Sequence, residues 1–101
     1  MKKTTILLAA LTLTSTTLAT DWPTWRGPDH DGQSKEKNLD LDWPESGPPL
    51  LWQSEGCGRG YASVAVSDGT IYTIGRRDDA EHLIAFDEKS GDEKWATPFG
   101  K

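Results

Sequence analysis

Cysteine and histidine are scarce in this chain of 101 residues, which holds one Cys and two His. A single cysteine cannot form a disulfide within the chain, so a disulfide-stapled scaffold is excluded. A structural zinc site takes four Cys or His ligands, and Cys57, His30 and His82 are too few to supply them. The sequence therefore excludes both kinds of cross-linked small domain.

Positive charge is also in short supply, because 11 Lys and Arg stand against 16 Asp and Glu and give a net charge of −5. An acidic chain has no electrostatic attraction to a phosphate backbone or to anionic lipid. We therefore expect no nucleic-acid partner. Long apolar runs are absent too, since residues 4–18, an uncharged stretch near the start, fall short of the roughly 20 apolar residues that span a bilayer.

The first 19 residues have the pattern of a secretory signal peptide. Lys2 and Lys3 precede the uncharged stretch of residues 4–18, and small residues, Thr17 and Ala19, occupy the positions that define a cleavage site. The alternative is a membrane anchor, for which this stretch is too short and too rich in Thr and Ser. We predict cleavage after Ala19, no stable membrane anchor and a periplasmic or extracellular protein.

Residues 20–49 form a segment rich in proline and tryptophan. They contain five of the six prolines and three of the five tryptophans, without helical or strand-like periodicity. Trp-Pro pairs at Trp22 and Trp43 disfavour helix, because the residue before proline is pushed to extended backbone. We expect an irregular but ordered segment, since large aromatic residues are uncommon in disordered linkers, which remain the alternative.

From residue 50 onwards the sequence indicates an all-β fold. Short runs rich in Val, Ile, Tyr and Trp alternate with turn residues, and they predict strands at residues 61–66, 70–75, 81–86 and 93–97. Asp68-Gly69 has the composition of a two-residue hairpin turn in which both residues take positive φ. Residues 75–81 are polar and are predicted to form an exposed loop. Residues 61–97 should therefore form one four-stranded antiparallel meander.

The last turn and strand of this meander resemble a known repeat. Alanine, aspartate, serine, glycine and tryptophan are spaced as in the Ala-x-Asp-x-x-Thr-Gly-x-x-x-Trp repeat of quinoprotein-type (pyrroloquinoline-quinone-repeat-like) β-propellers, at Ala85, Asp87, Ser90, Gly91 and Trp95. Serine replaces the usual threonine. The resemblance implies one propeller blade, in which the Trp ring stacks between adjacent blades, the Ala leaves space for it, and the Asp and Ser side chains tie the turn.

Two further segments extend this resemblance. Residues 21–28 with Asp31-Gly32 are similar to the opening of exported quinone-repeat-like propeller proteins. Trp52 stands 43 residues before Trp95, which is about one blade period. We therefore expect residues 50–54 to be a ring-closing strand of another blade, which here either lacks a ladder partner or pairs at the free edge of the blade present, with Trp52 largely exposed. A closed propeller needs more than about three hundred residues, so the resemblance implies an N-terminal fragment of an incomplete, truncated propeller domain (residues 50–101).

Two functions follow from the resemblance. The first is an exported, non-enzymatic scaffold whose loops bind a protein or carbohydrate ligand, with no cofactor. The second is a dehydrogenase of alcohols or sugars that uses pyrroloquinoline quinone (PQQ) and calcium. The adjacent Cys-Cys pair typical of such dehydrogenases is not found in this sequence. We expect the scaffold.

No catalytic, cofactor-binding or metal-binding residues can be assigned from the sequence. His30 and His82 are expected to be solvated, and the acidic pairs Asp29/Asp31 and Asp78/Asp79 lack the spaced ligands and central glycine of a calcium loop. Glycines surround Cys57 at residues 56–60, and we expect a flexible loop there rather than a ligand-binding one. No role is assigned to the Cys57 thiol.

Overall fold

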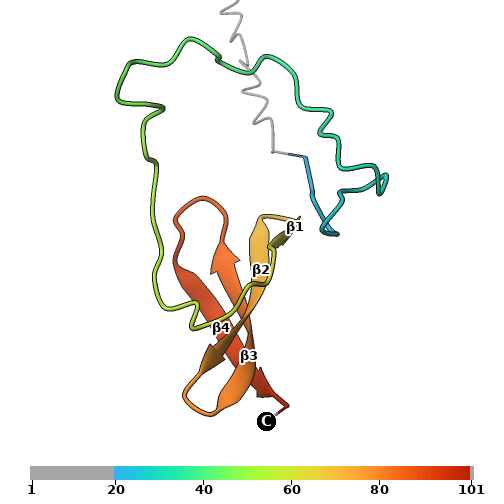
Figure 1. The fold of residues 1–101 in the computed structure, drawn as a ribbon, viewed down its shortest axis with the longest axis vertical. Helices are drawn as coiled ribbons and strands as arrows, with labels where there is room; N and C mark the ends of the chain where they lie inside the picture. Colours follow the sequence, from blue (N-terminus) through green and yellow to red (C-terminus); the bar gives the residue numbers. More distant parts are fainter. Residues whose placement is uncertain (1–19, 101) are drawn as a thin grey trace, which may run out of the picture.

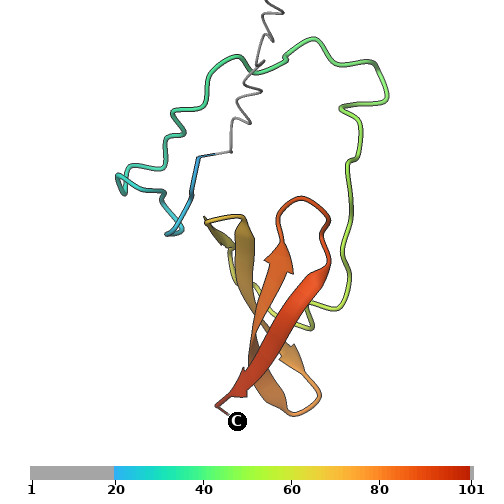
Figure 2. The same ribbon diagram turned by 180° about the vertical axis from the view of Figure 1, so that it is seen from behind.

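A computed structural model describes residues 20–100, and the predicted signal peptide lies outside these residues. The described chain is a long irregular segment followed by one four-stranded antiparallel sheet (Figures 1 and 2). The strands are β1 (Ala65–Ser67), β2 (Thr70–Arg77), β3 (Ala80–Asp87) and β4 (Glu93–Phe99). They lie in sequence order, so the predicted all-β meander is confirmed. Within residues 20–100 no helix is long and apolar enough to cross a membrane.

The hairpin between β1 and β2 forms at the predicted turn. Ser67 pairs with Thr70, and Asp68 and Gly69 between them have φ values of 48° and 71°. Positive φ at both central residues is what a type I′ turn requires, and its twist matches that of the flanking strands. The Asp-Gly dipeptide therefore sets the register of the first strand pair.

The hairpin between β2 and β3 is tighter than predicted. The predicted loop over residues 75–81 is wrong, because β2 runs through Arg77, β3 begins at Ala80, and only Asp78-Asp79 separate them. The polar residues pair with each other across the ladder: the Arg76 guanidinium lies 3.3 Å from the Glu81 carboxylate. The polarity of residues 75–81 was therefore a poor indicator of a loop, because backbone hydrogen bonds between strands do not require apolar side chains.

Strand β1 is shorter than predicted, because regular pairing begins only at Ala65 instead of residue 61. Upstream, Arg59 forms a single antiparallel bridge with Arg76 of β2. Arg59 and Ala65 are six residues apart, but their partners Arg76 and Tyr72 are four apart. Two extra residues must be accommodated on the outer side, so the intervening segment leaves the ladder.

The register of the sheet defines two faces, because alternate side chains of a strand point to opposite sides. One, which we call the open face, carries Tyr72, Ile74, Leu83, Trp95 and Phe99. The other, which we call the covered face, carries Ile71, Gly75, His82, Ile84 and Phe86. Its Ile84 and Phe86 are 0% and 4% exposed, so the core lies on the covered face.

Ala85 is the one fully buried residue of the open face. It pairs with Tyr72 on one side and with Trp95 on the other. The two aromatic rings are 6.1 Å apart and inclined at 54°. A small residue at this position lets both rings lean over the strand between them.

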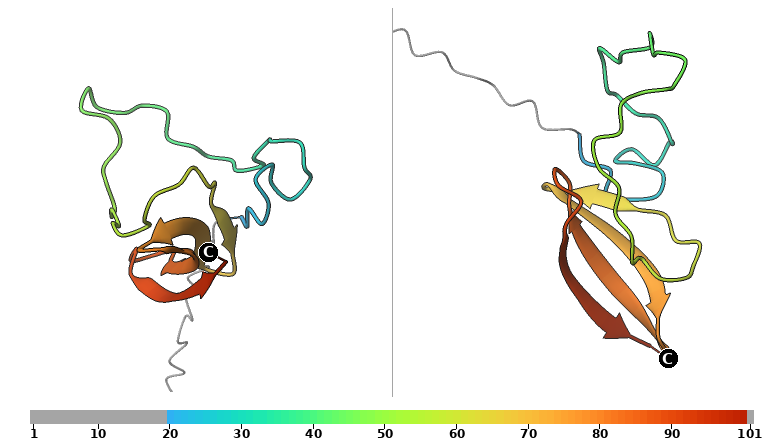
Figure 3. Two further views of the ribbon diagram at one scale, coloured as in Figure 1. Left: turned by 60° about the horizontal axis from the view of Figure 1, so that its bottom comes forward. Right: turned by 90° about the vertical axis from the view of Figure 1, so that its left-hand side faces the viewer.

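A β-bulge brings Trp95 onto this face. Phe86 pairs with Glu93 while the preceding Ala85 pairs with Trp95, so Lys94 is an extra residue on β4. The Lys94 ammonium donates a hydrogen bond of 2.9 Å to the buried hydroxyl of Thr70. The bulge thus ends regular pairing at the start of β4. Figure 3 shows the twisted sheet from two further directions.

We predict that Gly69→Ala destabilises the sheet by about 1–2 kcal/mol, the cost of a left-handed conformation in a residue with a Cβ. Gly32→Ala is the matched control: Gly32 has nearly the same φ of 73° and open space for a Cβ, but it lies in the irregular segment outside the sheet, so this substitution should change the free energy of unfolding of the sheet much less. Urea unfolding of residues 20–101, followed by the β-sheet circular dichroism signal, measures both. Equal losses in the two variants would contradict the role of this turn in the sheet.

Candidate functional site

The turn between β3 and β4 is built around the Asp87 carboxylate. One of its oxygens, Oδ1, accepts hydrogen bonds of 2.9 Å from the backbone N–H groups of Lys89 and Ser90, and one of 3.3 Å from the Ser90 hydroxyl. These bonds, that of the Ser90 N–H foremost, lower the pKa of Asp87 from its ordinary 3.8. Gly91 donates its N–H to the Asp87 carbonyl at 2.8 Å with a φ of 76°. Aspartate, serine and glycine of the motif thus form one hydrogen-bonded turn.

Trp52 packs on this turn, although it is 39 residues upstream of Gly91. Its indole N–H donates a 3.0 Å hydrogen bond to the Glu88 carbonyl. A Cβ on Gly91 would lie only 2.7 Å from Cδ2 of the indole, so the ring rests directly on the glycine. The absence of a side chain at Gly91 is therefore what admits Trp52.

This contact corrects the prediction for residues 50–54. They form no strand and have no ladder partner, as one of the predicted arrangements had it. The expected exposure of Trp52 is wrong, however, because the residue is half-buried and has a hydrogen-bond partner. The sequence contained the spacing of 43 residues between Trp52 and Trp95 but no signal for the surface that Trp52 contacts.

Residues 52–60, which we call the strap, run from the turn at Gly91 to β2 and contact the covered face at Gly75. The carbonyl of Cys57 occupies the space that a Cβ on Gly75 would take, and Gly58 lies against the backbone of Arg76. The next residue, Arg59, exchanges backbone hydrogen bonds of 3.0 and 2.8 Å with Arg76. The glycines thus permit close contact of the strap with β2, while the predicted flexibility of this segment stays a prediction.

Arg77 ties the strap to the two ends of the sheet. Its Nε donates a 2.6 Å hydrogen bond to the Gly56 carbonyl of the strap. Its two terminal nitrogens donate to both carboxylate oxygens of Glu93, at 3.2 and 2.7 Å. The hydrogen bond from Arg77 lowers the pKa of Glu93 from its ordinary 4.5. This contact was not predicted from the sequence, because Arg77 was expected to lie in an exposed loop.

The open face, in contrast, is not covered by any of the described residues along β4. Ile74, Leu83, Trp95, Thr97 and Phe99 line a hollow of about 360 Å³. Ile74, Trp95 and Phe99 remain 41%, 42% and 47% exposed. A surface of this kind, apolar and contiguous, is typical of an interface with another protein segment.

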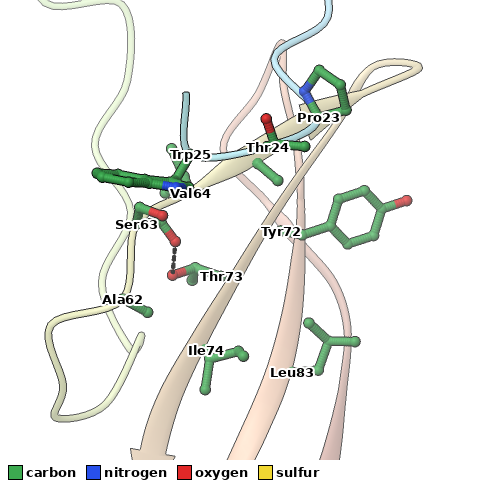
Figure 4. A pocket seen from close by; sticks show the side chains of 11 residues that line it. Pro23, Thr24, Trp25, Ala62, Ser63, Val64, Tyr72, Thr73, Ile74 and Leu83 are labelled. Carbon is green, nitrogen blue, oxygen red and sulfur yellow. Dashed lines mark hydrogen bonds between the residues drawn. The ribbon is translucent and has the colours of Figure 1, made fainter. Parts of the chain in front are cut away.

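A second hollow of about 370 Å³ adjoins the first, since Ile74 and Leu83 line both. Figure 4 shows Trp25 of the N-terminal segment beside Val64, and Tyr72 of β2 also lines this hollow. The Thr73 hydroxyl donates a 3.3 Å hydrogen bond to the carbonyl of Ser63, and both residues line this hollow. Aromatic and apolar side chains with a few polar groups are the usual lining of a binding groove.

The acidic pairs and histidines singled out in the sequence form no common site. Asp29 is ion-paired with Lys35, Asp31 accepts from the Gln33 N–H at 2.9 Å, and Asp78 lies at the exposed tip of a hairpin. His82 has its Nδ1 3.0 Å from the Ala80 carbonyl. From residue 20 to residue 100, no three Asp, Glu, His or Cys side chains are grouped as metal ligands. These residues therefore do not fit calcium.

Comparisons of the chain with protein-family models, with curated proteins and with solved structures found no match. The resemblance to a propeller repeat therefore rests on the motif from Ala85 to Trp95. The geometry that bears on it is the turn around Asp87 and the packing of Trp52 on Gly91.

We predict that Trp52→Ala lowers the free energy of unfolding by about 2 kcal/mol, less than the 3–5 kcal/mol of a fully buried Trp because the ring is half-buried. Trp52→Phe should cost about 1 kcal/mol, since it keeps a ring on Gly91 and loses the hydrogen bond to Glu88. Urea unfolding of residues 20–101 measures both.

Trp43→Ala is the matched control for these variants. Trp43 is 56% exposed and donates its indole N–H only to the Asp40 carbonyl of its own loop. Its removal should change the free energy of unfolding by no more than about 0.5 kcal/mol. Equal effects of the Trp43 and Trp52 truncations would show that the contact with Gly91 does not stabilise the sheet.

Proposed function

We propose that this chain forms part of an exported, non-enzymatic β-propeller that serves as a binding scaffold, with the four-stranded sheet as one blade. The observation that carries the proposal is the packing of Trp52 on Glu88 and Gly91. Trp52 stands 43 residues before Trp95, about the length of one blade. A tryptophan one period upstream thus occupies the turn that leads into the strand of the next tryptophan.

The same packing, repeated one blade further along the chain, predicts what Trp95 contacts. Trp95 is the counterpart of Trp52, and its ring is 42% exposed at the edge of the open face. We propose that it packs on the glycine turn of a following repeat as Trp52 packs on Gly91. The ring-closing role of residues 50–54 is part of the same proposal.

The apolar side chains left at the surface of the open face also support the proposal. A four-stranded blade has two faces and two edges, and neighbouring blades normally bury its faces. In this chain the strap lies against one face, and Ile74, Leu83 and Phe99 remain at the surface of the other. A following blade would bury this apolar area.

A scaffold function fits the groups that are present better than catalysis does. The Asp29 and Glu93 carboxylates are ion-paired, His82 lies against the Ala80 carbonyl, and the contact of the Ser90 hydroxyl with the Asp87 carboxylate belongs to the hydrogen-bonded turn itself. The ligand we propose is a protein or a carbohydrate, bound at loops or in the groove beside Trp25 and Tyr72. PQQ and calcium belong to the alternative, a dehydrogenase.

A dye-reduction assay tests whether residues 20–101 by themselves carry the activity of the alternative, a dehydrogenase. Residues 20–101, supplied with PQQ, calcium and a panel of alcohols and sugars, should reduce no electron-accepting dye above the rate of the cofactor alone. The reason is that the Glu93 carboxylate is bound to Arg77 and the Asp87 carboxylate to N–H groups of its own turn, so neither is free to act as a general base. Dye reduction that requires both the protein and a substrate would overturn the scaffold proposal in favour of the dehydrogenase.

A further inference from the structure

The start of the described chain is held in place by contacts with two distant segments. Trp22 exchanges backbone hydrogen bonds of 2.8 and 2.9 Å with Val66 at the outer edge of β1. The Asp21 carboxylate accepts a 3.0 Å hydrogen bond from the N–H of Asp68 in the type I′ turn. These bonds fix the residue that precedes them, Thr20, beside the sheet.

The backbone nitrogen of Thr20 meets a carboxylate. It donates a 2.7 Å hydrogen bond to Oε1 of Glu36, whose own N–H donates to the Ser34 hydroxyl at 3.2 Å. A niche of about 30 Å³ adjoins this contact, lined by Thr20, Trp22, Pro28, Gln33, Ser34 and Lys35. The hydrogen bond from Thr20 lowers the pKa of Glu36 from its ordinary 4.5.

We infer that Glu36 is the receptor for the α-ammonium group that removal of the signal peptide creates at Thr20. The inference rests on the export that is part of the proposed function. A signal peptidase adds water across the peptide bond between residues 19 and 20, which leaves a carboxylate on residue 19 and an amino group on Thr20. This amino group is protonated at neutral pH, so the neutral hydrogen bond to Glu36 becomes an ion pair.

The other charged groups near Thr20 are already engaged. The Asp21 carboxylate is bound to the Asp68 N–H, and the Lys35 ammonium is ion-paired with Asp29. Glu36 is thus the carboxylate placed to receive the new charge. Processing then strengthens the attachment of the N-terminal segment to the sheet edge, where Trp22 pairs with Val66.

The test begins with the full chain, expressed with its first 19 residues in a secreting bacterium. The exported protein should have the mass of residues 20–101. Its α-amino group is then acylated near pH 7, and the rate is followed by mass spectrometry of the N-terminal peptide. Because Glu36 holds the amine in its unreactive protonated form, Glu36→Gln should be acylated about 1.5- to 5-fold faster, the range expected for an exposed ion pair.

Two controls isolate the contact. Glu45→Gln removes the same charge from an exposed loop position and should keep the rate of the natural chain. At about pH 10 the amines are deprotonated in every variant, so the rates should converge. Equal rates for the natural chain and Glu36→Gln near pH 7 would overturn the inference while leaving export intact. An N-terminus other than Thr20 would overturn the cleavage site itself.

Discussion

The rest of this structure depends on one constraint: both apolar faces of the four-stranded sheet must be buried by another segment. Four strands are too few for the sheet to close into a barrel, so each apolar face needs another segment packed against it. The strap supplies that segment on one side, and Ile84 and Phe86 there are buried. The other side keeps Ile74, Trp95 and Phe99 partly exposed.

Glycine makes the covered side possible. Gly75 and Gly91 both stand where a Cβ would overlap the strap, the first at the Cys57 carbonyl and the second at the Trp52 ring. Arg77 then links the Gly56 carbonyl with the Glu93 carboxylate through its guanidinium. Close backbone contacts and one bidentate ion pair thus hold the strap against the sheet, where a bigger domain would use a larger apolar core.

The sequence predicted local features well and contacts between distant segments poorly. Asp68-Gly69 encodes its own turn geometry, and the runs rich in Val, Ile, Tyr and Trp between turn residues identify the strands. The extent of β2 was missed because the Arg76–Glu81 pairing depends on residues across the ladder. The position of Trp52 was missed for a similar reason: a half-buried and an exposed tryptophan look the same in sequence until the surface that receives them is known.

The candidate site was predictable only as a motif. The spacing from Ala85 to Trp95 identified the turn residues, whose mutual hydrogen bonds are local in sequence. The groove beside Trp25 and Tyr72 is formed by segments almost fifty residues apart, and no local sequence pattern predicts it. The contact between Thr20 and Glu36 likewise needs the whole N-terminal segment to turn back on itself.

The central claim is that the open face is built to pack against a further repeat of the same kind. Sequencing of the gene beyond the codon for Lys101 tests it most directly. The account predicts another segment with the spacing of Ala85, Asp87, Gly91 and Trp95, its tryptophan about 40 to 50 residues after Trp95. A stop codon directly after Lys101, or a continuation without this spacing, would contradict the claim.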